Sequence, residues 1–167
     1  LYNTNVGNLY GLSETGPTHI DDPRGKNWKP GSIGVPLDVN ECKVSEDGDL
    51  LIKGDNVFIG YYKNKNLYEK VIVDGWFHTG DLGNYKNGRY YFSDRKKDLI
   101  IKGGINISPD EIDDILFTMD GVKEAATVGI SDDYLGEKIV SFLVIEADKN
   151  LDASSVKDFC SNFLSRD

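Results

Sequence analysis

The 167-residue sequence has few of the residues that build disulfides and metal sites. It contains two cysteines, Cys42 and Cys160, and two histidines, His19 and His78. The cysteines are far apart and lack metal-ligand spacing, and two histidines are too few for a histidine-based metal site. We therefore expect both cysteines to be reduced and structural, which is typical of a cytoplasmic protein.

Long apolar runs and an excess of positive charge are also missing. No run approaches the roughly 20 apolar residues that a membrane-spanning helix needs, so no transmembrane segment is expected. The formal net charge is −9, which argues against nucleic acid as a partner. The hydrophobic content of 39% and the 18 glycines indicate an ordinary globular protein that is rich in loops.

The positive charge that is present is concentrated in residues 86–102. This segment has six lysine and arginine side chains against two aspartates, a net charge of +4 that leaves −13 for the other residues. A basic segment in an acidic protein can form an anion site. It can also be the solvated face of a hairpin, and charge alone favours that interpretation.

The first part of the chain, up to about residue 96, has a β-rich pattern. Residues 1–32 are polar and glycine-rich and predict a loop. A hairpin is predicted over "CKVSEDGDLLIKG", with Asp47 and Gly48 in its turn, and "GRYYFSDR" predicts a strand entered through the turn 86–88. Several short strands at close spacing indicate a small barrel-like or sandwich-like segment.

After Gly104 the pattern becomes that of a small α+β unit. A helix is predicted to start with Ser108 as N-cap, Pro109 at the first helical position and Glu111 completing a capping box, and to stop at Gly121. "VKEAATVGI" and "EKIVSFLVIEA" predict strands. "SSVKDFCSNFLS" predicts a second helix, whose apolar side would hold Val156, Phe159, Cys160, Phe163 and Leu164.

The sequence thus predicts an α+β protein in which a β-barrel-like segment precedes an α+β domain. The boundary falls inside "DRKKD", which gives domains of residues 1–96 and 97–167.

The stretch "YGLSETGP", from Tyr10 to Pro17, places small residues, a hydroxyl and a carboxylate close together. Ser13 can donate to a phosphate oxygen, and Glu14 can hold a hard cation such as Mg²⁺. The alternative is a turn in which both side chains only cap local structure.

Two further stretches combine polar side chains with glycine. In "GWFHTGDL", Asp81 can accept hydrogen bonds from both hydroxyls of a ribose, although a solvent-exposed turn residue is the simpler interpretation. In "SDRKKDLIIKGG", Arg95 offers a planar fork of donors. Gly103 and Gly104 allow the backbone to lie against a ligand, while the alternative is a charged strand end followed by a turn.

The order and spacing of these stretches resemble a known family. "YGLSETGP", "WFHTGDLG" and "GRYYFSDRKKDLIIKGGINISPDEID" are similar to consecutive motifs of the AMP-forming acyl-CoA synthetases in the adenylate-forming superfamily. The resemblance covers nearly the whole chain. It implies that a carboxylic acid is activated with MgATP to acyl-AMP and pyrophosphate, after which coenzyme A displaces AMP to give a thioester.

The resemblance also implies roles for single residues, beginning with the first motif. Tyr10 would stack on adenine, Ser13 would contact phosphate, and Glu14 would hold Mg²⁺, so that the catalytic contacts come from Ser13 and Glu14.

In the later motifs, Asp81 would bind the ribose hydroxyls with help from Arg95. Lys97 stands where the family has the hinge of its small, mobile C-terminal domain. Gly103 and Gly104 would form the loop beside the coenzyme A thiol.

The sequence departs from the family at two places. No loop rich in serine, threonine and glycine and ending in lysine occurs before Tyr10, and no Gly-Lys segment follows "CSNFLSRD". We therefore expect a fragment, inactive in isolation, that lacks most of the acyl pocket and leaves the acid unspecified. The alternatives are an adenylation domain that loads a carrier protein and a non-catalytic, truncated nucleotide-binding module.

Overall fold

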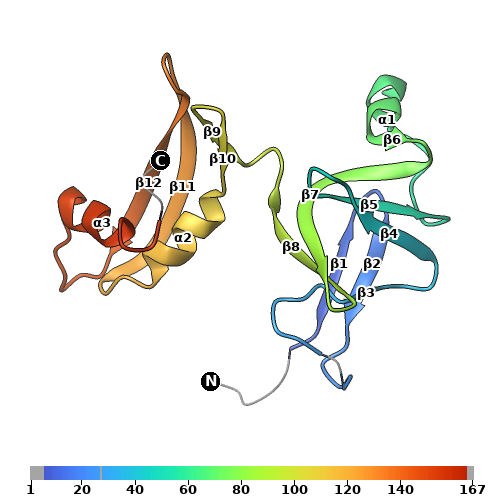
Figure 1. The fold of residues 1–167 in the computed structure, drawn as a ribbon, viewed down its shortest axis with the longest axis horizontal. Coiled ribbons are helices and arrows are strands. Elements are labelled where there is room, and N and C mark those ends of the chain that lie inside the picture. The colour runs from blue at the N-terminus through green and yellow to red at the C-terminus, as the bar shows by residue number, and fades with distance from the viewer. Residues whose placement is uncertain (1–5, 27, 165–167) are drawn as a thin grey trace. The chain divides into compact units, whose positions relative to one another are not determined.

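Residues 6–26 and 28–164 are described by the computed structural model of the protein (Figure 1). Contacts divide the chain into two units, Leu1–Lys96 and Lys97–Asp167. The described residues of the first form two antiparallel sheets and one short helix, and those of the second form one sheet and two helices. The predicted α+β class is confirmed.

The first sheet contains the "YGLSETGP" stretch and has the order β1-β2-β3, with β1 at Asn8–Leu12, β2 at Gly16–Asp21 and β3 at Val35–Pro36. The prediction of a loop over residues 1–32 is therefore wrong for much of its described part. The polar residues Thr18, His19 and Asp21 are buried in β2, which hides the hydrophobic alternation by which strands are found. Gly16, at φ 61°, closes the turn between β1 and β2.

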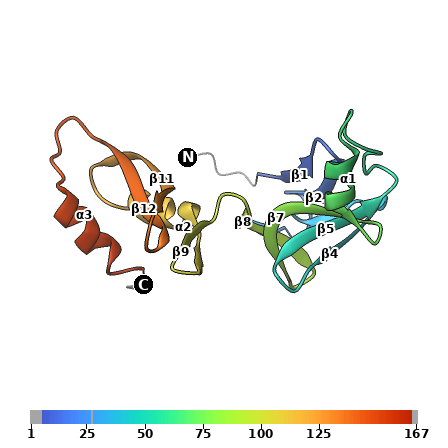
Figure 2. The same cartoon turned by 90° about the horizontal axis from the view of Figure 1, so that it is seen from above.

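The second sheet curls on itself, and its longest strand bends strongly (Figures 1 and 2). Its order is β4-β5-β7-β6, and β8 also pairs with β7. The strands are β4 (Asn40–Val44), β5 (Asp49–Gly54), β6 (Ile72–Val73), β7 (Trp76–Lys86) and β8 (Arg89–Arg95), and the short helix α1 (Lys65–Val71) leads into β6. The β4–β5 hairpin and the β8 strand were both predicted and are confirmed.

The core of the first unit lies between its two sheets. Ile33, Leu50 and Tyr90 form a buried cluster, and Tyr10 packs against it. Tyr90 is fixed at both ends, because its hydroxyl donates to the carbonyl of Cys42 at 2.6 Å and its backbone bridges to Gly34. Tyr10, at the start of the first motif, is therefore held by the core.

The second unit has one four-stranded sheet in the order β10-β9-β12-β11. Both helices cover one face of it, because both line a single apolar groove together with β12. The elements are β9 (Ile100–Lys102), β10 (Ile105–Ile107), α2 (Pro109–Phe117), β11 (Val122–Asp132), β12 (Gly136–Ile145) and α3 (Ala153–Cys160). The strands and helices expected after Gly104 are all present.

The ends of the helices differ from the expectation in detail. Ser108 caps α2 by accepting from the N–H of Glu111 at 3.2 Å, but no reciprocal bond from the Glu111 side chain occurs among the described residues, so the capping box is half formed. α2 ends at Phe117, before Gly121. α3 ends at Cys160, which leaves Phe163 outside the helix and 62% exposed rather than on an apolar face.

The N-cap of α2 provides a test of the second unit's stability. We expect Ser108→Ala to lower its free energy of unfolding by about 1 kcal/mol, because the Glu111 N–H loses its acceptor. Urea denaturation followed by circular dichroism measures the change. Ser154→Ala, at an exposed position within the first turn of α3, is the matched control and should change stability by less than about 0.5 kcal/mol. Equal effects would show that the cap contributes nothing.

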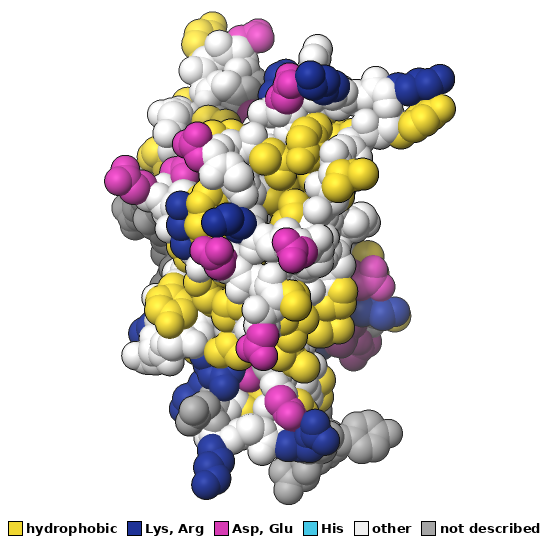
Figure 3. Space-filling model, turned by 90° about the vertical axis from the view of Figure 1, so that its right-hand side faces the viewer, with side chains coloured by type: hydrophobic (Ala, Val, Ile, Leu, Met, Phe, Trp, Pro, Cys, Tyr) yellow, Lys and Arg dark blue, Asp and Glu magenta, His cyan; other side chains and the backbone are white. Residues whose placement is uncertain are grey.

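The surface of the first unit mixes charge and apolar side chains. Figure 3 looks onto the end of this unit and shows hydrophobic side chains interspersed with acidic and basic ones. Ile59 and Tyr62 are among the most exposed hydrophobic residues. No helix in residues 6–26 and 28–164 is long and apolar enough to cross a membrane.

Candidate functional site

Three of the residues singled out in the sequence meet in a pocket of the first unit. The hydroxyl of Tyr10 donates to Oδ2 of Asp81 at 2.8 Å, and Nε of Arg95 lies 3.3 Å from Oδ1 of the same carboxylate. The pocket has a volume of about 330 Å³ and is lined by Asn8, Leu9, Tyr10, Gly11, Gly31, Ile33, Asp81, Phe92 and Arg95. Residues from β1, β7 and β8 thus converge on one carboxylate.

The position of Asp81 is set by the course of β7. Gly80 in this strand has a φ of 73°, a backbone conformation that favours glycine. The N–H of Asp81 donates to Oγ1 of Thr79 at 3.0 Å, and the Thr79 hydroxyl lies 2.8 Å from the carbonyl of Leu50 on β5. Asp81 pairs with Arg95 in the β7–β8 register and is 3% exposed, so the interpretation as a solvent-exposed turn residue is wrong.

The electrostatics of the pocket keep Tyr10 as a hydrogen-bond donor. Burial, followed by the hydrogen bond to Asp81 and the negative charge of Asp81, raises the pKa of Tyr10 far above its usual range. The ring of His19 lies edge-on to Tyr10, with centroids 5.5 Å apart. Burial lowers the pKa of His19 to about 4, so this imidazole is neutral at pH 7.

This arrangement suits a nucleoside. Each oxygen of a carboxylate has two acceptor positions, so Asp81 can bind Tyr10 and Arg95 and still accept from ligand hydroxyls. Arg95 is 54% exposed and can reach a ligand without leaving the carboxylate. Phe92 and Ile33 supply apolar lining. The site therefore combines a fixed acceptor with aromatic and apolar walls.

Ser13 and Glu14 do not line this pocket but lie in the turn between β1 and β2. Ser13 is exposed, whereas Glu14 is half-buried and its Oε1 accepts from the hydroxyl of Tyr61 at 2.9 Å. Within the described residues no group of three or more metal-ligating side chains occurs. The single carboxylate of Glu14 is compatible with Mg²⁺, because proteins commonly hold this ion through one or two carboxylates together with substrate phosphates.

The remaining predicted residues belong to the second unit or its boundary. Lys97 is the first residue of that unit and is exposed in the turn at residues 96–98. Gly103 and Gly104, at φ 60° and 84°, form the turn between β9 and β10. A Cβ atom at either position would meet nothing within 4 Å, so glycine is favoured here by backbone conformation and not by lack of space.

Several residues near the site were not found from the sequence. Phe92 lies two positions after the buried Tyr90 in β8, and the period of a strand could have placed both on one side. Asn56, Phe58 and Tyr61 contact the Glu14 turn from a loop more than 40 residues away. No local pattern in the sequence indicates those contacts.

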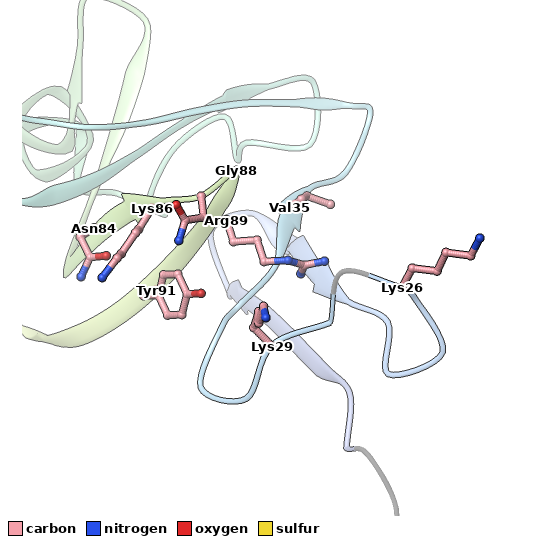
Figure 4. A pocket seen from close by; sticks show the side chains of 9 residues that line it. Lys26, Lys29, Val35, Asn84, Lys86, Gly88, Arg89 and Tyr91 are labelled. Carbon is pink, nitrogen blue, oxygen red and sulfur yellow. The ribbon is translucent and has the colours of Figure 1, made fainter.

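The basic segment 86–102 does not form one anion site in the structure. Arg89, Arg95 and Lys96 are ion-paired with Asp21, Asp81 and Asp47, respectively. A separate hollow of about 690 Å³ is lined by Lys26, Lys29, Lys86 and Arg89, together with Val35, Asn84, Asn87, Gly88 and Tyr91. Figure 4 shows Lys86 beside Asn84, whereas Lys26 reaches away at the opposite end. The cations do not converge on one point.

Comparison with known proteins shows what this chain is similar to. A family model described as "AMP-binding enzyme C-terminal domain" matches residues 111–166. The long-chain-fatty-acid–CoA ligase of Bacillus subtilis (strain 168) is 36% identical over 168 residues, and the match covers 93% of this chain and 30% of the ligase. The 2-succinylbenzoate–CoA ligase of Listeria monocytogenes serotype 4b is 38% identical over 157 residues, with 93% and 33% covered.

Solved structures give the same result. ATP-bound MatB from Rhodopseudomonas palustris matches with a TM-score of 0.87 and 30% identity, over 96% of this chain and 34% of that one. Over 93% of its length or more, the chain is therefore similar to part of these ligases and of MatB. A second solved structure, that of O-succinylbenzoate coenzyme A synthetase from Bacillus subtilis in complex with AMP, matches with a TM-score of 0.79 and 33% identity, over 96% of this chain and 35% of that one. The chain spans about a third of the length of the curated relatives it matches.

Proposed function

We propose that this chain is the part of an AMP-forming acid–thiol ligase that holds the nucleotide and presents the acyl-adenylate to coenzyme A. In the first step the carboxylate of the acid attacks the α-phosphorus of ATP, which gives acyl-AMP and releases pyrophosphate. In the second step the thiol of coenzyme A attacks the acyl carbonyl, and AMP leaves. The observation that carries the proposal is the convergence of Tyr10 and Arg95 on the buried carboxylate of Asp81.

The nucleoside is assigned to this pocket on chemical grounds. Asp81 accepts the two ribose hydroxyls, and Arg95 both holds Asp81 and donates to oxygens of the ligand. Tyr10 presents its ring to adenine while its hydroxyl stays on Asp81. Because these groups are already bonded to one another, ATP binds without first reorganising them.

The phosphates are assigned to the turn between β1 and β2. Ser13, which is exposed, donates to a phosphate oxygen, and Glu14 is the protein ligand of the Mg²⁺ that accompanies ATP. When bound, Mg²⁺ neutralises charge on the phosphates during attack. The contribution of the chain is to fix the carboxylate and the hydroxyl at the same short turn.

The second unit is assigned to the thioester step. Lys97, at the boundary of the two units, acts as the hinge, and the Gly103–Gly104 turn lies against the pantetheine arm of coenzyme A. The two cysteines of the described chain are free thiols, and we place the reaction in the cytoplasm, where thiols stay reduced.

The test uses the full-length protein that contains this chain. Exchange of labelled pyrophosphate into ATP is measured against a panel of carboxylic acids that includes long-chain fatty acids and 2-succinylbenzoate. Thioester formation is then measured with coenzyme A and, separately, with a phosphopantetheinylated carrier protein. Exchange with one acid and transfer to coenzyme A are the expected results. Transfer to the carrier protein alone would replace the proposed acceptor, and the absence of exchange with every acid would overturn the proposal.

A further inference from the structure

The loop after β5 contacts the Glu14–Thr15 turn at three points. The N–H of Phe58 donates to the carbonyl of Glu14 at 2.7 Å. The side-chain amide of Asn56 donates to the carbonyl of Thr15 at 2.7 Å. The hydroxyl of Tyr61 donates to Oε1 of Glu14 at 2.9 Å. Two bonds therefore fix the backbone of the turn, and the third fixes the orientation of a carboxylate.

Tyr61 is itself held by an aromatic cluster. Its ring meets Phe58 edge-on with centroids 4.7 Å apart, and Phe58 contacts Tyr68 at 5.3 Å and Phe77 at 5.7 Å in the same manner. Phe77 lies in β7 and is 2% exposed. The Tyr61 hydroxyl is thus positioned by α1 and by the strand that also carries Asp81, and edge-on aromatic pairs of this kind stabilise one arrangement.

The hydroxyl of Tyr61 stays a donor at neutral pH. Burial, the hydrogen bond to Glu14 and the charge of Glu14 all raise the pKa of Tyr61 above its ordinary value. Oε2 of Glu14 has no hydrogen-bond partner among the described residues, which leaves one oxygen of the carboxylate open. The neighbouring Tyr62 is 87% exposed, so two adjacent tyrosines have different environments.

We propose that Tyr61 is a positioning residue that orients the Glu14 carboxylate for the magnesium ion of MgATP. This inference rests on the proposed function, because it assumes that Glu14 receives the cation. Tyr61 touches neither the nucleotide nor the reacting atoms in this scheme. It acts by occupying Oε1, so that the carboxylate cannot rotate and Oε2 remains available.

The kinetic test compares Tyr61→Phe with Tyr62→Phe in the full-length protein. Each variant removes a single hydroxyl and keeps the ring. Tyr61→Phe should raise the Mg²⁺ concentration for half-maximal pyrophosphate exchange, and the KM for MgATP, by about tenfold with a smaller change in kcat, the size expected for one lost hydrogen bond to a charged group. Tyr62→Phe should match the parent. Identical Mg²⁺ dependence in both variants would overturn the inference.

A spectroscopic test does not depend on turnover. In full-length protein with ¹³C-labelled tyrosine, Glu14→Gln should shift the ring signals of Tyr61 and leave those of Tyr62 unchanged, because the Tyr61 hydroxyl donates to Glu14 whereas Tyr62 is exposed. With ATP present, added Mn²⁺ should broaden the ring signals of Tyr61 and should lose this effect in Glu14→Gln. Unchanged Tyr61 ring signals in Glu14→Gln, or no broadening of Tyr61 by Mn²⁺ in a protein that performs exchange, contradict the positioning role. Broadening without any exchange activity would retain the metal site and reject the proposed function.

Discussion

Asp81→Ala is expected to weaken ATP binding to the full-length protein by about a hundredfold. The substitution removes the acceptor for two ribose hydroxyls, and each hydrogen bond to a charged group contributes about 1.5 kcal/mol in a partly buried site. It also releases Arg95 and the hydroxyl of Tyr10, which are bonded to this carboxylate. Isothermal titration calorimetry with a non-hydrolysable ATP analogue measures the change in Kd.

The matched control for this variant is Asp38→Ala. Asp38 is exposed in the turn before β4, so the substitution changes the net charge equally without touching the pocket. Asp81→Asn keeps the shape and one acceptor but loses the charge, and we expect a loss of about tenfold. Kd values for Asp81→Ala and Asp38→Ala within a factor of about two of each other would rule out Asp81 as the ribose acceptor.

Lys97→Pro is expected to slow the thioester step by about thirtyfold or more while changing pyrophosphate exchange by less than about threefold. Proline fixes φ near −65° and also restricts Lys96, so a rotation centred on this turn is blocked. The N–H of Lys96 donates to the carbonyl of Gly80 at 2.8 Å, which makes position 96 unsuitable for proline. At position 97 no described hydrogen bond is lost.

Lys97→Ala is the control for the side chain, because it leaves the backbone free to rotate. Single-turnover measurement of acyl-AMP formation and of its transfer to coenzyme A separates the two half-reactions. Equal loss in both steps, or the same defect in Lys97→Ala, would contradict the assignment of Lys97 as a backbone hinge.

Local signals in the sequence predicted those elements whose causes are local. The β4–β5 and β7–β8 turns contain Asp-Gly and Asn-Gly pairs, and the observed positive φ values of Gly48, Asn87 and Gly88 are those that such turns require. Ser108 caps α2 because its acceptor and the Glu111 N–H are three residues apart. The β1–β2 hairpin was missed because its buried residues include Thr18, His19 and Asp21, which no hydrophobic pattern reveals.

The sequence predicted which residues form the candidate site, but not their burial or their hydrogen-bond partners. The motifs indicated Tyr10, Asp81 and Arg95, and the structure brings these three together. The backbone of Asp81 is held by Thr79, whose hydroxyl donates to the carbonyl of Leu50 in another strand. The contact of Tyr61 with Glu14 joins residues 47 positions apart. Such environments are set by tertiary packing, which a local reading of the sequence does not contain.

The Gly103–Gly104 turn has a thermodynamic consequence. Two consecutive glycines often indicate a flexible segment. Here, however, the flanking strands β9 and β10 are hydrogen-bonded to each other, and the N–H of Gly103 donates to the carbonyl of Leu135 at 2.7 Å. Its backbone is therefore ordered before any ligand arrives. A ligand that lies against this turn contacts backbone that is already ordered. The turn therefore loses little conformational entropy when the ligand binds.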